Sequence, residues 1–425
     1  MRIAVIGSGI TGLSAAWLLA NKHQVTVFEA NNYAGGHSNA VDVQLDGINY
    51  PVDTGFLVFN EKTYPNLIQL FNLLDVEIAN TDMSFSVRLP SENIEWAGSD
   101  LNSLFAQRRN LLRPDFWRMI SDILRFNRQA DSLLIKATNN RWTLGQLLQA
   151  EKYSKTFADW YLLPMGAAIW STPSADMLNF PAQSFIQFCL NHGLLQISNR
   201  PQWLTVKGSS RNYVKKLCAG IGDVRLNTPV ISVQRHNNHV LVNTAHEQLT
   251  FDKVILACHS DQSLNLLGSD IRANEKTVLS AIRYAPNKAY LHSDSSLMPK
   301  HKNAWAAWNY YTDSQAKQTH AVAVTYWLNK LQPLPFKTPL FVTLNPPSVP
   351  QHILREFDYA HPQLDAAAYQ AQQQLAAIQG QDGVYFAGAW ASYGFHEDGL
   401  KAGMRVARLL GATIPWTAVL DNHHG

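Results

Sequence analysis

The sequence predicts an α/β fold in which a buried parallel sheet is interleaved with a second, α+β part of the chain. A short apolar run, Ile3–Ile6, leads into a glycine-rich turn, a helix to about Asn21 and a second strand over Gln24–Glu29. Two later apolar runs, Val254–Ala257 and Val384–Ala387, have the unbroken hydrophobicity of strands that are buried on both faces. The segments between these runs are rich in aromatic residues, as expected of a separate half-buried sheet with its own helices.

The first turn has the spacing G-x-G-x-x-G, and each glycine has a physical task. Gly7 permits a tight turn, Gly9 lets the backbone approach a pyrophosphate, and Gly12 lets the helix lie close to the strand. The free N–H groups at the helix start, at Ile10 and Thr11, would face the phosphates. The motif therefore predicts dinucleotide binding.

The end of the second strand supports this prediction. Glu29, followed by Ala30, places a carboxylate where it could accept hydrogen bonds from a ribose diol. The alternative is a glycine-rich turn in some other α/β protein, which leaves Glu29 unexplained.

Composition limits the class of protein. The chain has 425 residues, 46% of them apolar and 16% charged, which is ordinary for a globular protein of two parts. A net charge of +3 gives no general attraction to nucleic acid. The three cysteines (Cys189, Cys218 and Cys258) are scattered, which favours a reduced, cytoplasmic setting and indicates neither disulfides nor a metal site. No run of roughly twenty apolar residues predicts a membrane span.

More glycine motifs follow the first turn. Gly35-Gly36-His37 comes soon after the ribose acid, a hairpin is expected over 41–52, and Gly55-Phe56 follows it. This order of motifs resembles the FAD-dependent amine oxidase superfamily, which includes monoamine and polyamine oxidases, protoporphyrinogen oxidase and phytoene desaturases. The resemblance implies FAD contacts at all of these residues, with His37 standing where the oxidases usually have Arg. It also implies that the backbone of Val230 meets the adenine.

A basic helical segment is expected over residues 101–134, with Pro114 in a first helical turn. Phe116, Ile120 and Ile123 share one face of this helix, and polar residues share the opposite face. Two interpretations stay open: peripheral contact with anionic lipid at the inner face of a membrane, or a solvated surface helix.

The stretch from Trp160 to Trp203 is apolar and aromatic, and His192 lies within it. Packing explains many of these side chains, and some are expected to line a cavity for a hydrophobic small molecule or lipid. The predicted division is an FAD-binding domain over 1–80, 205–266 and 372–425, and a substrate-binding domain over 81–204 and 267–371.

The last motif begins with the strand that ends at Gly388, and a helix is expected from about Gly399 to Leu410. In the resembled superfamily an acid follows this glycine, but here the residue is Ala389. The resemblance implies flavin contacts at Gly388, Ala389, His396, Asp398, Gly399 and Leu400, with the helix start directed at the flavin ring. It is nearest to a bacterial subgroup associated with cyclopropane-fatty-acid synthases.

The implied chemistry is hydride transfer to a flavin, which requires neither a metal nor a catalytic triad. Candidates for an acid, a base or a ring contact are His396, Glu397, Tyr393 and, by its position in the superfamily, Lys288. No cysteine follows Cys258, so non-covalent FAD is expected.

The leading hypothesis is desaturation or double-bond isomerisation of a fatty-acyl or similar lipid chain. An amine oxidase that releases hydrogen peroxide, a nicotinamide-dependent dehydrogenase and a non-catalytic flavin-binding or electron-transfer protein stay open, as does the oligomeric state.

Overall fold

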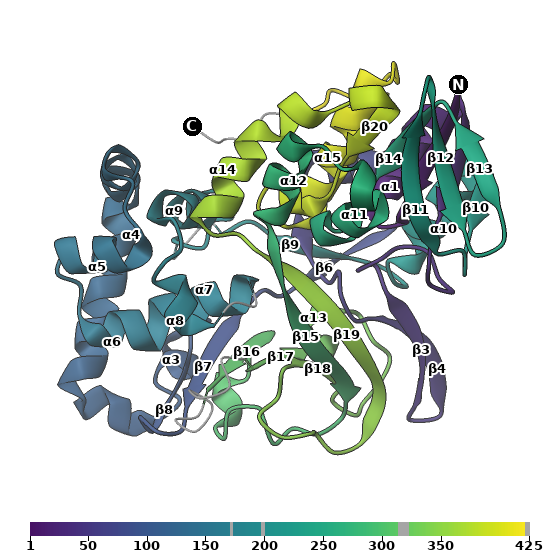
Figure 1. Cartoon of the computed structure of the whole chain (residues 1–425). Helices are drawn as coiled ribbons and strands as arrows, with labels where there is room; N and C mark the ends of the chain where they lie inside the picture. The colour runs from purple at the N-terminus through teal and green to yellow at the C-terminus, as the bar shows by residue number, and fades with distance from the viewer. Residues whose placement is uncertain (171–172, 197–199, 313–322, 421–425) are drawn as a thin grey trace.

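The computed structural model describes residues 1–170, 173–196, 200–312 and 323–420. Figure 1 shows three regions: a layered α/β region that holds the N-terminus, a large sheet below it, and a group of helices to one side. The described part of the predicted segment 372–425 ends at residue 420.

The α/β region is built on a five-stranded parallel sheet assembled from distant parts of the chain. Its order is β10 (Asp223–Arg225), β2 (Gln24–Phe28), β1 (Arg2–Ile6), β14 (Lys253–Leu256) and β20 (Val384–Phe386). β1 is central and buried from Ile3 onward, as its apolar run predicts. The predicted α/β class with its parallel sheet is confirmed.

Helices cover this sheet and connect it to the rest of the molecule. α1 (Ile10–Ala20) packs against both α10 (Arg211–Ile221) and α15 (His396–Leu409). The other elements of this region are α2 (Pro65–Leu73), the sheet β11 (Val230–His236), β12 (His239–Thr244) and β13 (Gln248–Phe251), α11 (Ser260–Leu267), η3 (Gly268–Asp270), α12 (Ala273–Ser280), α14 (Ala366–Gln374), η6 (Leu375–Ile378), η7 (Gln381–Gly383) and η8 (Ala389–Ala391).

The second large sheet has seven strands. Its pairs are antiparallel except β16 with β7, and β15 pairs with β19 over nearly its whole length (Figure 1). The order is β19 (Ile353–Gln363), β15 (Arg283–His292), β18 (Phe341–Leu344), β17 (Ala323–Trp327), β16 (Trp308–Tyr311), β7 (Phe85–Leu89) and β8 (Ile94–Ala97).

Smaller elements join the two regions. The hairpin expected over 41–52 is present as β3 (Ala40–Leu45) and β4 (Ile48–Asp53). A three-stranded sheet orders β5 (Phe59–Asn60), β9 (Trp203–Val206) and β6 (Ile78–Thr81). Short helices are η4 (Lys302–Ala304) and α13 (Leu328–Leu331).

The helical group begins with α3 (Leu101–Leu104), η1 (Arg108–Leu112) and α4 (Pro114–Asn140), so the predicted helical segment is interrupted before Pro114 and runs past residue 134. α4 packs on α9 through its buried residues. The remaining members are α5 (Leu144–Ala150), α6 (Lys155–Phe157), the π-helical turn η2 (Ala158–Leu162), α7 (Leu163–Trp170), α8 (Ser174–Met177) and α9 (Ala182–Asn191). Among the described residues, no helix has both the length and the apolarity that a bilayer crossing needs.

Candidate functional site

A cavity of about 1020 Å³ begins at the carboxyl ends of four parallel strands. The residues that follow β1, β2, β14 and β20 all line it. This is the edge at which open parallel sheets bind their ligands. The cavity then extends past β19 to aromatic side chains of α7, α9 and β9.

The first glycine turn has the shape its sequence predicts. Gly7 has a φ of +105°, and a Cβ there would lie 2.8 Å from the Ala257 oxygen. A Cβ on Gly12 would lie 1.9 Å from the Gly7 oxygen, so this glycine is required for packing. A Cβ on Gly9 would meet nothing within 4 Å. Gly9 lines the cavity, and its bare backbone leaves room for a phosphate group against the start of α1.

The second glycine pair supports the first turn. The Gly35 N–H donates to the Ser8 carbonyl over 3.0 Å, and a Cβ on Gly36 would lie 3.1 Å from the Gly9 Cα. Both glycines have positive φ angles, +123° and +58°, that side chains disfavour. The pair therefore holds the phosphate turn in place while lining the same cavity.

Glu29 lies at the cavity wall, and its carboxylate is held by neighbouring groups. One oxygen accepts from the Ser8 N–H and hydroxyl over 3.0 and 2.6 Å, and the other accepts from the N–H and side-chain amide of Asn31, both over 2.9 Å. Ala30 lines the cavity beside it. The carboxylate is therefore fixed at the end of β2, where a ribose could bind.

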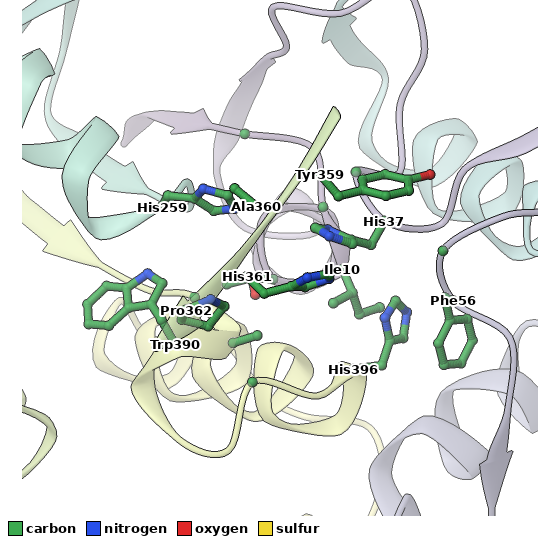
Figure 2. Close-up of a pocket in the computed structure, with 18 of the residues that line it drawn as sticks. Ile10, His37, Phe56, His259, Tyr359, Ala360, His361, Pro362, Trp390 and His396 are labelled. Atoms are coloured by element: carbon green, nitrogen blue, oxygen red, sulfur yellow. The ribbon is translucent and has the colours of Figure 1, made fainter. Parts of the chain in front are cut away.

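Four histidines, His37, His259, His361 and His396, line the cavity, and Figure 2 shows His37 and His361 near each other with His259 and His396 on either side. The His37 ring stacks on Tyr359 with centroids 5.0 Å apart and lies 5.5 Å from the His361 ring. Burial, reinforced by His259, lowers the pKa of His37 to about 4, and burial with His37 and His259 lowers that of His361 to about 3. These rings are therefore neutral near pH 7.

Hydrogen bonds fix the tautomer of His361. The Asn345 side-chain amide donates to Asn287 Oδ1 over 2.7 Å, which orients the Asn287 NH₂ group toward His361 Nδ1, 2.9 Å away. Because Nδ1 accepts this bond, the proton of the neutral ring resides on Nε2.

His396 begins α15 and lines the cavity. Its ring stacks on Phe56 with centroids 3.8 Å apart, and a hydrogen bond of 2.7 Å joins its Nε2 to the Tyr213 hydroxyl. Burial, with a smaller contribution from His37, lowers the pKa of His396 to about 3. Near pH 7 the His396 side chain is therefore a neutral imidazole, held in one orientation, and not an imidazolium that could act as an acid.

The loop before α15 also forms cavity wall. Gly388, Ala389, Trp390 and Tyr393 line it. The Trp390 indole donates to the Cys258 carbonyl over 3.1 Å, and a Cβ on Gly388 would lie 2.1 Å from the same indole nitrogen. Gly388 is thus needed because Trp390 folds back over it.

Several residues expected to contact the cofactor do not line the cavity. Asp398 accepts a hydrogen bond of 2.9 Å from the Phe395 N–H and so caps α15, which starts at His396 and not at about Gly399 as predicted. A Cβ on Gly399 would lie 2.9 Å from both Ile10 Cγ2 and Thr11 Oγ1, so this glycine allows α15 to pack on α1. Leu400 is fully buried. With Gly12, these residues shape the cavity indirectly.

The structure places Glu397 in a supporting position outside the cavity lining. Its carboxylate accepts hydrogen bonds from the Asn66 N–H and side-chain amide over 3.1 and 2.7 Å, and from the Leu67 N–H over 3.0 Å. These groups belong to the start of α2, where the unpaired backbone donors of a helix need acceptors. The structure therefore gives Glu397 a supporting role at the start of α2, and its position lends no support to the expected role as an acid or base.

Lys288 is also outside the cavity lining. It lies on β15, where its ammonium group pairs with Glu356 over 3.2 Å and with Asp358 over 3.3 Å. Its side chain is 39% exposed. The superfamily position therefore does not place this lysine in the cavity lining.

The aromatic half of the cavity contains one histidine of the apolar stretch Trp160–Trp203. His192 lines this half, and its ring stacks on Phe188 with centroids 3.8 Å apart. Its Nδ1 donates to the Phe188 carbonyl over 2.9 Å, which leaves Nε2 without a proton in the neutral ring and without a hydrogen-bond partner among the described residues. Burial lowers the pKa of His192 to about 4.

Of the predicted cofactor contacts, Gly7, Gly9, Gly35, Gly36, Gly55 and Gly388 line the cavity, as do Glu29, Ala30, His37, Phe56 and Val230, whereas Gly12 and Gly399 do not. Sequence reasoning missed the roles of His259, Tyr359 and His361. The only sequence signal for these residues is their position: His259 comes soon after β14, and Tyr359 and His361 lie near the end of the long strand β19. Among the described residues, no cluster of His, Cys, Asp or Glu has the arrangement of a metal site.

Comparisons with known proteins show relatives of this chain in sequence and in fold. A 106-residue match, 31% identical, is to a 4,4'-diapophytoene desaturase of Staphylococcus aureus, and it spans only 22% of this chain and 21% of that protein. In fold, the chain is similar to a fatty acid isomerase from P. acnes (13% identity, TM-score 0.67, 96% of this chain and 97% of that one). It is also similar to cyclohexylamine oxidase from Brevibacterium oxydans (16% identity, TM-score 0.65, 96% and 98%). Residues 10–302, more than half of the chain, match the family described as flavin containing amine oxidoreductase, and the chain therefore belongs to this family of flavin-carrying oxidoreductases.

Proposed function

We propose that this protein is an FAD-dependent oxidoreductase that removes a hydride from a hydrophobic substrate, with a fatty-acyl or similar lipid chain as the first candidate. One observation carries the proposal: a single cavity has the glycine turn and Glu29 at one end and the aromatic side chains of α7, α9 and β9 at the other. Its volume of about 1020 Å³ is at the upper end of ordinary ligand sites, as a long cofactor together with a substrate would require.

FAD fits the residues at the first end. Gly9 and the start of α1 would hold the diphosphate, Glu29 the adenosine ribose, and the backbone near Val230 the adenine. We expect non-covalent binding because no cysteine follows Cys258, and burial raises the pKa of Cys258 itself to about 11, which keeps it a thiol. Acid precipitation followed by mass spectrometry of the supernatant should recover intact FAD. Yellow colour retained on the precipitate would contradict this.

When bound, FAD would supply the acceptor for a hydride from a substrate C–H bond. The chain's own residues bind the substrate and exclude water. The aromatic half is lined by Ile169, Trp170, Phe188, Leu194 and Trp203, with His192 as its polar member and no carboxylate from residues 160–203 in the described lining. Such a wall favours an uncharged hydrocarbon chain over an ammonium group.

The position of His192 bears on which of the two lipid reactions, desaturation or isomerisation, the protein carries out. Desaturation removes a hydride from one carbon and a proton from its neighbour, so it needs a base, whereas isomerisation by hydride departure and return does not. His192 Nε2 is unprotonated, lacks a partner among the described residues and lies next to Phe188, which contacts Phe395 of the loop before α15. Its placement favours desaturation.

The test of the lipid reactions is anaerobic mixing of the flavin-loaded protein with unsaturated fatty acids, with flavin bleaching and product mass as readouts. If His192 is the base, His192→Phe should keep its flavin and its ring stacking but bleach about 10²-fold more slowly. Isomerisation would be favoured if the wild-type protein and the His192→Phe variant bleached the flavin at equal rates and the product had an unchanged mass and a shifted double bond.

An amine oxidase that produces hydrogen peroxide is the second candidate, favoured by the fold shared with cyclohexylamine oxidase. A peroxide-coupled screen across amines decides between the two. Turnover of simple amines with silence on lipids would replace the lipid hypothesis. Failure of both classes to bleach the flavin would favour a flavin-binding or electron-transfer protein without a substrate of its own.

The expected setting is a reducing, cytoplasmic one. The three cysteines are free in the structure, and Cys189 and Cys258 are shielded by burial, which raises the pKa of both thiols.

A further inference from the structure

The helical group carries an exposed apolar and basic surface at its tip, formed by α3, η1 and the first five residues of α4. We call this surface the α3–α4 tip. Its apolar members are Leu101, Leu111, Leu112 and Trp117, which are 74%, 45%, 87% and 48% exposed. Its basic members are Arg108, Arg109, Arg113 and Arg118. Large exposed apolar side chains gathered in one place mark an interaction surface.

Hydrogen bonds and a ring contact hold the α3–α4 tip in one conformation. The Trp117 indole donates to the Leu111 carbonyl over 2.9 Å, and its ring lies 5.3 Å from that of Phe105. Arg109 and Arg113 both donate to the Asn93 carbonyl, over 2.7 and 3.0 Å. These bonds hold η1 against β8 and leave Leu111 and Leu112 outward.

Charge identifies the kind of partner. Residues 101–118 contain four arginines and one carboxylate, Asp115. Among the described residues, none of the four arginines forms an ion pair. A segment with four arginines and one carboxylate beside exposed leucines and a tryptophan has the composition of a surface that rests on an anionic bilayer.

The amphipathic face expected from the sequence is not the one exposed. Phe116 is fully buried, and Ile120 and Ile123 are half-buried against the core. On the opposite face, Arg125 pairs with Asp122 over 3.0 Å and lies over the Tyr153 ring. The predicted apolar face of α4 is therefore packed against the core, and Leu124 and Ile135, which are exposed farther along α4, lie outside the α3–α4 tip.

We propose that the α3–α4 tip docks the protein on anionic lipid bilayers, with Leu111, Leu112 and Trp117 entering the headgroup region and the arginines contacting lipid phosphates. A second copy of the chain fits less well, because a two-fold contact through this tip would set the four arginines against their own copies. The proposal does not depend on the substrate or on the flavin.

Flotation of the full-length protein with vesicles tests the proposal. The protein should float with phosphatidylcholine–phosphatidylglycerol vesicles and much less with phosphatidylcholine alone, and raising the salt should reduce binding. Leu111→Ser with Leu112→Ser should weaken partitioning roughly tenfold or more, and Arg118→Gln about fivefold. Val349→Ser, a matched change at an apolar residue 66% exposed elsewhere, should leave binding unchanged.

Three results would overturn the proposal: no flotation of the wild-type protein with anionic vesicles, equal flotation of the double serine variant, or a wild-type dimer that this variant dissociates while neither protein floats. Thermal midpoints measured on every variant show whether a loss of flotation reflects unfolding.

Discussion

Gly9 and Gly12 belong to the same turn, but an added methyl group would meet different surroundings at each. Alanine substitutions at these two positions therefore distinguish an effect on FAD binding from an effect on folding. Gly9→Ala adds a Cβ into open cavity, so we expect unfolding free energy of the flavin-free protein to change by less than about 0.5 kcal/mol. FAD affinity should fall by at least about tenfold because the methyl occupies the phosphate position. Gly12→Ala forces a Cβ against the Gly7 oxygen and should cost about 3 kcal/mol even without FAD. Urea unfolding and flavin titration measure the two effects; similar unfolding losses in both variants would contradict the assignment.

Glu397 and Lys288 give a second residue-scale prediction, because both carry charge but only one is buried. Glu397→Gln replaces an acceptor of the Leu67 N–H, bonded over 3.0 Å, by an amide that cannot satisfy all three donors. We expect a loss of about 2 kcal/mol in unfolding free energy, with turnover per bound flavin unchanged. Lys288→Met should change neither stability nor turnover beyond about twofold, since its ion pairs are exposed. A large fall in turnover per flavin in either variant would restore a catalytic role.

At the scale of elements, the contact between α1 and α15 joins the two ends of the chain. A Cβ on Gly403 would lie 2.4 Å from the Thr11 carbonyl oxygen and 2.6 Å from Ser14 Oγ. Gly403→Ala should therefore move α15 away from α1, lower stability by about 3 kcal/mol and release flavin, because α15 and the loop before it form cavity wall. Gly98→Ala, whose Cβ would have its nearest neighbour at 3.8 Å, is the control. Flavin fluorescence and thermal unfolding report both changes, and retention of flavin with normal stability would contradict this reading of the contact.

Elements differed in how well the sequence predicted them. β1, α1 and β2 follow from local pattern alone, because burial on both faces and the glycine turn each leave a short-range signal. The predicted start of α15 is wrong because the capping side chain is that of Asp398, the third residue of the helix, rather than that of a residue before it. Lys288 and His361 could not be assigned from sequence because their positions depend on the register of β15 with β19, a pairing between segments far apart in the chain.

At the scale of the whole molecule, the cavity exists because the ends of the chain and its middle converge. Gly9 and Glu29 come from the first thirty residues, His259 from the middle, and His361 and His396 from the last seventy. The four histidines therefore become neighbours only on folding. Nothing local in the sequence marks them as a group, whereas the phosphate end of the site is marked by a glycine motif within one short segment.

The convergence of histidines predicts a pH dependence of global stability. The folded pKa values of His37, His192, His361 and His396 are about 4, 4, 3 and 3, below the ordinary value of 6.5. Between pH 6.5 and about 4 the unfolded chain binds more protons at these sites, so stability present above pH 6.5 is lost as the pH falls. Each ring contributes up to about 1.4 kcal/mol per pH unit in this window. Urea unfolding of the flavin-free protein at pH 7, 6 and 5 measures the slope of the unfolding free energy against pH. The His396→Phe variant keeps a ring against Phe56 but cannot take up a proton there, so this slope should be shallower by the contribution of one histidine. An identical slope in the variant would show that His396 does not contribute, and protonation of the other groups would then have to account for the acid sensitivity.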